Sequence, residues 1–119
     1  MTDSAYVYIN LDYLNLMIDG DNDMKKVMLE MLFDELPTEI EKMNMHAANH
    51  NWQELKAVSH KMKSTLAFVG NDVLTVSNQE IEQIAKSESR TERVPAPLEK
   101  IGVLAPKVLA ELRKEHSRL

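Results

Sequence analysis

The sequence contains no cysteine, which excludes disulfide bonds, thiolate catalysis and cysteine-based zinc sites together. With three glycines and four prolines in 119 residues, the chain has few of the turn-forming residues that a β protein needs. No stretch approaches the roughly 20 apolar residues of a membrane span. Residues 1–10 lack the basic and apolar regions of a secretory signal. We therefore expect a cytoplasmic protein without a membrane partner.

Positive charge is not concentrated anywhere in the chain. The net charge is −5, and the 14 lysines and arginines are scattered. Nucleic-acid binding requires a concentrated basic face, so nucleic acid is not an expected partner. Glycine-rich phosphate loops and the nucleophile elbow of hydrolases are also missing. What remains is rich in the helix formers Leu, Met, Glu, Lys and Ala.

Apolar residues recur at spacings of three and four, which predicts helices. The expected helical segments are 11–19, 23–48, 51–70, 72–85 and 97–115. Asn51 is expected to cap the start of the third segment and Gly70 to end it. Gly102 and Pro106 are expected to disturb the middle of the last segment. The predicted fold class is all-α, an antiparallel four-helix bundle with a short additional N-terminal helix, forming a single domain over residues 1–119.

His60 is the histidine in the most informative setting. Its neighbours three and four residues away on the helix are Lys56, Ala57, Lys63 and Ser64. The apolar stripe of this helix points elsewhere, so His60 is expected at the edge of the bundle, open to solvent. A neutral imidazole there can act as a nucleophile, with Lys63 placed to pair with a phosphoryl oxygen. By spacing alone, an incidental surface histidine is the more common explanation.

The stretch 59–70, SHKMKSTLAFVG, resembles the signature of histidine-containing phosphotransfer (HPt) domains. In that family a phosphoacceptor histidine is followed by an apolar residue, a lysine, small residues and a glycine that closes the helix. Those places are filled here by Met62, Lys63, Ser64, Thr65 and Gly70. The resemblance extends over residues 8–112, nearly the whole chain. It implies that His60 is a phosphoacceptor and that the chain is a phosphocarrier rather than an enzyme.

The resemblance also implies a carboxylate or amide on the next helix that holds the second imidazole nitrogen. Register from His60 and Gly70 places this group at Glu82, with Gln79 or Gln83 as substitutes. It would leave Nε2 of the ring as the nucleophile. Ser64 departs from the glycine that is commonest after the lysine. Serine is small and able to donate to a phosphoryl oxygen, so the change is expected to be tolerated, with its effect on partner choice or rate left open.

The implied partners are response-regulator receiver domains and a sensor or hybrid histidine kinase. His60 would attack the acyl phosphate of a receiver aspartate in line, and the receiver would supply Mg²⁺, so no cofactor of the chain's own is expected. We expect a monomer. The identities of donor and acceptor, the signal served, and whether the chain stands alone or belongs to a hybrid kinase stay open.

Docking of a receiver requires apolar surface near His60. The candidates are Leu14, Met17, Ile18, Met24, Val27, Met28 and Met31, with Lys56 and Ala67 on the same approach. Methionine is flexible and polarizable, which suits a surface that accepts more than one partner. Some of these side chains belong to the core, and the sequence does not say which.

Two other functions are kept open. An HPt-like helical adaptor would bind a receiver or kinase without being phosphorylated and would not need His60. Alternatively, His46 and His50 lie four residues apart with Met43 and Met45 nearby, a spacing that can chelate a transition metal. Only two histidines and no carboxylate are supplied there, so the metal site is the weaker alternative.

Overall fold

A computed structural model describes residues 6–119, and this part of the chain contains helices and no strand. The helices are α1 (Asp12–Ile18), α2 (Asn22–Ala48), α3 (Trp52–Val69), α4 (Asp72–Ser87) and α5 (Pro95–Ser117), with the 3₁₀ turn η2 (Thr91–Arg93) before α5. The predicted all-α class, with a short N-terminal helix before four long ones, is confirmed.

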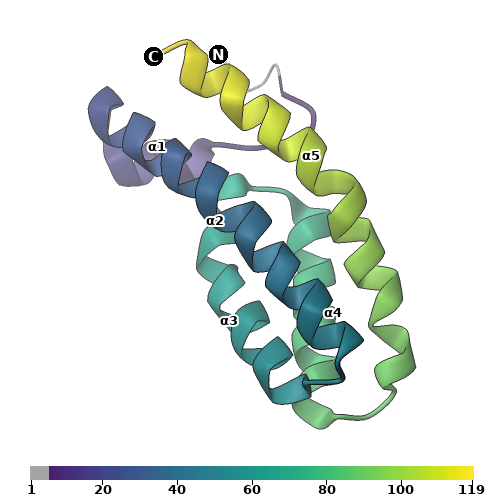
Figure 1. The fold of residues 1–119 in the computed structure, drawn as a ribbon. Coiled ribbons are helices and arrows are strands. Elements are labelled where there is room, and N and C mark those ends of the chain that lie inside the picture. The colour runs from purple at the N-terminus through teal and green to yellow at the C-terminus, as the bar shows by residue number, and fades with distance from the viewer. Residues whose placement is uncertain (1–5) are drawn as a thin grey trace.

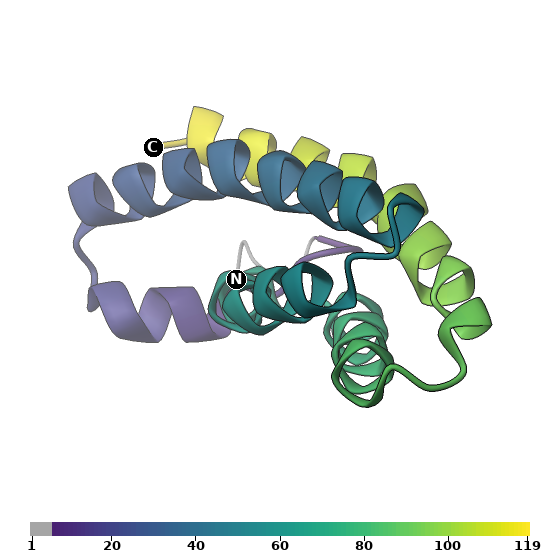
Figure 2. The same ribbon diagram turned by 60° about the horizontal axis from the view of Figure 1, so that its bottom comes forward.

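The four long helices form a closed bundle (Figure 1). α3 packs against α2 and α4, and α5 packs against the same two helices, so each long helix has two neighbours. α1 contacts both α2 and α3. Figure 2 shows α1 beneath the N-terminal half of α2, beside the end of α3. The bundle core is built from the fully buried apolar stripes, including Leu29, Leu32, Leu36, Met43, Leu55, Met62, Leu74, Ile81, Ile101 and Leu112.

Local chemistry explains most helix ends. Asp21 caps α2 by accepting a hydrogen bond from the backbone N–H of Met24 (3.0 Å), and Asn71 caps α4 in the same way. Gly70 ends α3 in the left-handed conformation, with φ of 72°. Asn51 does occupy the residue before α3, but its side chain makes no capping hydrogen bond, so the predicted capping box is wrong.

α5 differs from the expectation at its start and in its middle. It begins at Pro95, where the missing N–H of proline costs nothing in the first turn. The helix then continues through Gly102 and Pro106 without interruption. Buried residues on both sides, Ile101 and Val108 among them, hold it against the bundle, and this packing outweighs the low helix propensity.

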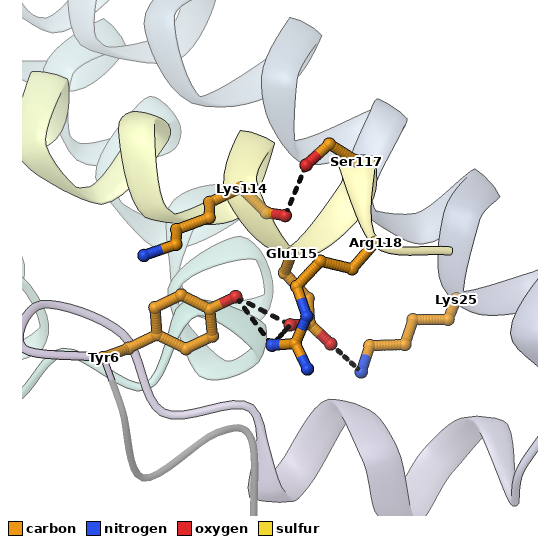
Figure 3. A network of polar contacts seen from close by, with 6 residues as sticks. All are labelled: Tyr6, Lys25, Lys114, Glu115, Ser117 and Arg118. Carbon is orange, nitrogen blue, oxygen red and sulfur yellow. Dashed lines mark hydrogen bonds and ion pairs between the residues drawn. The ribbon is translucent and has the colours of Figure 1, made fainter.

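Residues 6–11 form a segment that we call the N-terminal strap. It runs beside α5 and leads directly into α1 (Figure 1). At its start, the Tyr6 hydroxyl donates to Oε1 of Glu115 (2.7 Å), whose Oε2 pairs with the buried ammonium of Lys25 (2.7 Å). Arg118 adds a third donor to the Glu115 carboxylate at 3.2 Å. Figure 3 shows how this network joins the strap, the start of α2 and the end of α5.

Within residues 6–119, every helix is too short or too polar to cross a lipid bilayer.

Candidate functional site

α3 presents His60 to solvent. The side chain of His60 is 72% exposed, whereas the neighbouring Ser59 is fully buried. The helix turns its apolar stripe, which includes Leu55 and Met62, into the bundle. The imidazole therefore stands on the outer face of α3, as its spacing predicts.

Glu82 on α4 holds the imidazole. Its Oε2 lies 2.9 Å from Nδ1 of His60, and its Oε1 lies 2.8 Å from Nζ of Lys63. The side chain of Glu82 is only 11% exposed, because α3 and α4 pack closely. The carboxylate thus uses one oxygen for each of two α3 side chains that lie three residues apart. Gln79 is exposed and does not occupy this position.

The site keeps Glu82 ionised. Burial by itself would raise the pKa of the Glu82 carboxyl, but the hydrogen bonds and charges of Lys63 and His60 outweigh it and lower the pKa. An ionised carboxylate can only accept, so Nδ1 is the protonated ring nitrogen. In the neutral ring, Nε2 of His60 then carries the free lone pair.

A buried polar clasp fixes the register of α3 on α4 next to the site. Ser59 donates its hydroxyl to the side-chain oxygen (2.7 Å) and the backbone carbonyl (2.9 Å) of Asn78. The Asn78 amide donates back to the carbonyl of Ser59 at 2.9 Å. Asn78 lies one turn before Glu82, and Ser59 directly precedes His60, so the clasp positions both partners of the pair. Sequence reasoning missed it, although a serine between apolar positions of α3 was its one signal.

An open pocket of about 460 Å³ lies beside the imidazole. It is lined by Lys56, Ala57, His60, Lys63, Glu82, Gln83 and Lys86. Sequence reasoning missed Lys86, which lies one turn after Glu82 on α4. Lys56 and Lys86 form no ion pair with any described residue, so two ammonium groups face a pocket whose single carboxylate is already paired. The pocket therefore suits an anion of two negative charges.

The surface beyond the imidazole is made of small side chains. Ser64 and Ala67, one and two turns after His60, are both exposed. Phe68 follows them and packs against Tyr13 of α1, with ring centroids 5.3 Å apart. The outer face of α3 thus continues onto α1.

The structure divides the candidate docking residues into three groups by exposure. Met17, Met24, Val27, Met31 and Ala67 are exposed, Met28 and Lys56 are half-buried, and Leu14 and Ile18 are buried. The docking role expected for Leu14 and Ile18 is therefore wrong, because these two side chains anchor α1 to the core. The outer side of α1 carries Tyr13 and Leu16 instead, and both are exposed. Tyr13 lies four residues before Met17, on the same face of the helix, and Leu16 directly precedes Met17. The expected exposure of Met17 was therefore the signal in the sequence that could have identified both residues.

Among the described residues, the histidine pair near the end of α2 has no third His, Cys, Asp or Glu beside it. Among residues 6–119, no three His, Cys, Asp or Glu side chains gather into a group that could hold a metal ion. His50 stacks on Trp52 instead, with ring centroids 5.3 Å apart.

Comparison with known proteins gives one match. The family model described as Hpt domain matches residues 27–119, which is most of the chain. No curated protein and no solved structure matches significantly.

Proposed function

Since the chain belongs to the Hpt domain family, we propose that it carries a phosphoryl group on Nε2 of His60 between the aspartates of receiver domains. Members of this family take part in histidine phosphotransfer in phosphorelays and are phosphocarriers, generally not classed as enzymes. The observation that supports His60 as the acceptor is its exposed ring, with Nδ1 held 2.9 Å from the buried Glu82 carboxylate.

The proposed step is an in-line exchange. The Nε2 lone pair of His60 forms a bond to phosphorus while the bond from phosphorus to the aspartyl oxygen breaks, and the aspartate leaves as a carboxylate. The proton on Nδ1 stays in place, so the ring gains a positive charge that the Glu82 carboxylate offsets. Mg²⁺ bound by the receiver would neutralise the phosphoryl oxygens from the other side. The reverse exchange passes the group to a second receiver.

Lysines supply the charge on this side of the exchange. Lys63 has three N–H donors, so it can keep its bond to Glu82 and still donate to a phosphoryl oxygen. Lys56 and Lys86 line the same pocket without a carboxylate partner among the described residues. Ser64 leaves room for the incoming receiver and offers a hydroxyl donor. Positioning and charge neutralisation are what phosphoryl transfer mainly requires of the protein.

The receiver would dock on a surface that we call the docking face. It comprises the exposed residues Tyr13, Leu16, Met17, Met24, Val27, Met31 and Ala67. The contact between Tyr13 and Phe68 makes α1 continuous with the outer face of α3 that bears His60. Exposed apolar side chains on α1, joined by this contact to the helix that bears His60, are typical of a protein interface.

The first experiment needs no partner. The protein is treated with phosphoramidate, and its histidines are followed by NMR. Phosphate on Nε2 of His60 ahead of His46, His50 and His116, labile in acid and absent from the His60→Gln variant, is the expected result. Phosphorylated protein is then mixed with isolated receiver domains, and transfer to an aspartate is recorded. An inert His60 that still leaves the protein able to bind receivers would contradict the proposal and favour the non-phosphorylated adaptor.

A further inference from the structure

We propose that Glu111 of α5 is a positioning residue for receiver docking, which it controls from a distance by fixing the N-terminal strap and, through it, helix α1. This inference rests on the proposed function. The inference assigns partner specificity to α1 and identifies Glu111 as the side chain that holds α1 in place. Glu111 belongs to neither the pocket around His60 nor the docking face.

The Glu111 carboxylate binds three successive backbone N–H groups of the strap. Oε2 accepts from Val7 at 3.0 Å, and Oε1 accepts from Tyr8 at 2.7 Å and from Ile9 at 3.1 Å. Consecutive N–H groups that converge on one anion form a strong, directional site, because each hydrogen bond is assisted by the charge. In addition, Nζ of Lys107, one turn earlier on α5, lies 5.5 Å from the centre of the Tyr8 ring.

The strap is also joined to the turn between α3 and α4. The Asn10 N–H donates to the carbonyl of Val69 at 3.0 Å, and the Asn71 amide donates to the carbonyl of Tyr8 at 2.8 Å. Gly70 lies directly under the strap, since a Cβ at that position would come within 2.1 Å of the Asn10 carbonyl oxygen. The strap therefore links α5 to the end of the helix that carries His60.

α1 depends on this anchoring. It has seven residues, far fewer than the roughly 12 that an isolated helix needs in water. Its first turn is tied to the strap, because the Asp12 N–H donates to the Asn10 side-chain oxygen at 2.9 Å. With Leu14 buried, α1 presents Tyr13, Leu16 and Met17 on its outer side. A displaced strap would move this part of the docking face relative to His60.

The docking face combines exposed residues of α2 and α3 with Tyr13, Leu16 and Met17 of α1. A receiver that contacts both parts would be selected by α1 in addition to the chemistry at His60. For this reason we assign partner specificity to α1 and its anchoring to Glu111.

The test compares Glu111→Ala with a matched control, Glu99→Ala, which removes an exposed carboxylate from the same helix. Three quantities are measured on the full chain: phosphorylation of His60 by phosphoramidate, affinity for a receiver chosen in the transfer assay above, and hydrogen exchange of the amides of residues 7–12. Glu111→Ala is expected to weaken receiver binding about tenfold, equivalent to about 1.4 kcal/mol. Exchange at residues 7–12 should accelerate, the phosphoramidate rate should stay within about twofold, and Glu99→Ala should change none of the three.

A double variant separates positioning from a general loss of stability. If Glu111 acts through α1, Leu16→Ala should weaken binding in the native background but add little in the Glu111→Ala background. Glu111→Gln keeps an acceptor oxygen but removes the negative charge, so it should weaken receiver binding less than Glu111→Ala does. Additive effects of Leu16→Ala and Glu111→Ala, or unchanged receiver binding in Glu111→Ala, would overturn the inference. Failure of the proposed function would look different, because His60 would then stay unphosphorylated in the native protein as well.

Discussion

At the residue scale, the site depends on how one carboxylate is shared between two donors. Glu82 orients His60 with one oxygen and holds Lys63 with the other, so its removal leaves the ring unoriented and the ammonium unpaired. The side chain is nearly buried, and water cannot fully replace it. The position of Glu82 could be predicted only from the register of a known family, whereas its second bond, to Lys63, required the structure.

We expect Glu82→Ala to slow the phosphorylation of His60 by phosphoramidate about tenfold, the lower end of the effect of removing a group that orients a histidine ring. Glu82→Gln should lose less, because an amide oxygen can still accept from Nδ1. Glu80→Ala, an exposed carboxylate two residues away, is the control. The rates are read from NMR time courses. A Glu82→Ala protein that reacts as fast as the native one would contradict the assigned role.

Lys56 and Lys86, the two pocket lysines that form no ion pair with a described residue, give a second prediction. Lys56→Gln and Lys86→Gln should each slow phosphorylation by about twofold, since exposed charge interactions contribute about 0.5 kcal/mol. In the double variant, the rate of phosphorylation should also depend much less on salt concentration, because salt acts on the rate by screening these charges. Phosphoramidate kinetics at low and high salt measure both effects. Lys100→Gln on α5, away from the pocket, should leave rate and salt dependence unchanged.

At the scale of elements, Gly70 shows why a helix end is fixed by more than its own sequence. Gly70→Ala would force a left-handed φ on alanine, at about 1–2 kcal/mol, and would drive Cβ into the strap at Asn10. Together, the two effects should lower the free energy of unfolding by more than about 2 kcal/mol. Gly102→Ala, where Cβ meets open space within a helix, should instead stabilise by about 0.5–1 kcal/mol. The free energy of unfolding of both variants is measured in urea. Equal changes in the two variants would contradict this prediction.

The clasp between α3 and α4 gives a prediction of its own. Asn78→Ala removes the amide that donates to the Ser59 carbonyl and one of the two acceptors of the Ser59 hydroxyl, which keeps its bond to the Asn78 backbone carbonyl. A lost hydrogen bond costs about 0.5–1.5 kcal/mol, so for the two lost bonds we expect a decrease of about 1–3 kcal/mol in the free energy of unfolding in urea. Gln79→Ala, its exposed neighbour, should stay within about 0.5 kcal/mol of the native protein. A small effect of Asn78→Ala would mean that packing alone sets the register.

Sequence predicts the elements of this fold well because apolar spacing is a local signal. The four stripes of the bundle, the end of α3 at Gly70 and the exposure of His60 all follow from residues within a turn or two. The strap does not, since its three hydrogen bonds to Glu111 join residues about a hundred positions apart. For the same reason, the burial of Leu14 and the continuity of α5 through Pro106 depend on packing partners that no local pattern reveals.

At the scale of the whole molecule, a buried ion pair joins the start of α2 to the end of α5. Glu115 and Lys25 pair with side chains that are 5% and 8% exposed, and Tyr6 donates to the same carboxylate (Figure 3). Removing one member of such a pair leaves an uncompensated buried charge, which costs about 3–5 kcal/mol. Replacing both can be nearly neutral, because neither charge then has to leave water. The pair therefore contributes to the response of the bundle to acid.

Burial by itself would raise the pKa of the Glu115 carboxyl, but hydrogen bonds from Lys25 and Tyr6 and nearby positive charges outweigh it and lower the pKa from its ordinary 4.5. Below pH 4.5 the unfolded chain therefore binds a proton that the folded chain still excludes. The contribution of Glu115 to stability is fully present above pH 4.5 and is lost as the pH falls through the lowered value.

Urea unfolding of the native protein between pH 7 and pH 3 should accordingly show a decline that begins below pH 4.5. The Lys25→Met and Glu115→Gln double variant should show a shallower decline, since the group whose proton uptake drives part of it is gone. The decline should not vanish, because the lowered pKa of Glu82 acts in the same direction. Glu115→Gln alone should lower the free energy of unfolding by about 3–5 kcal/mol at pH 7, because it leaves the buried Lys25 without its carboxylate partner. An equally steep decline in the double variant would assign the acid response of the bundle to other carboxylates.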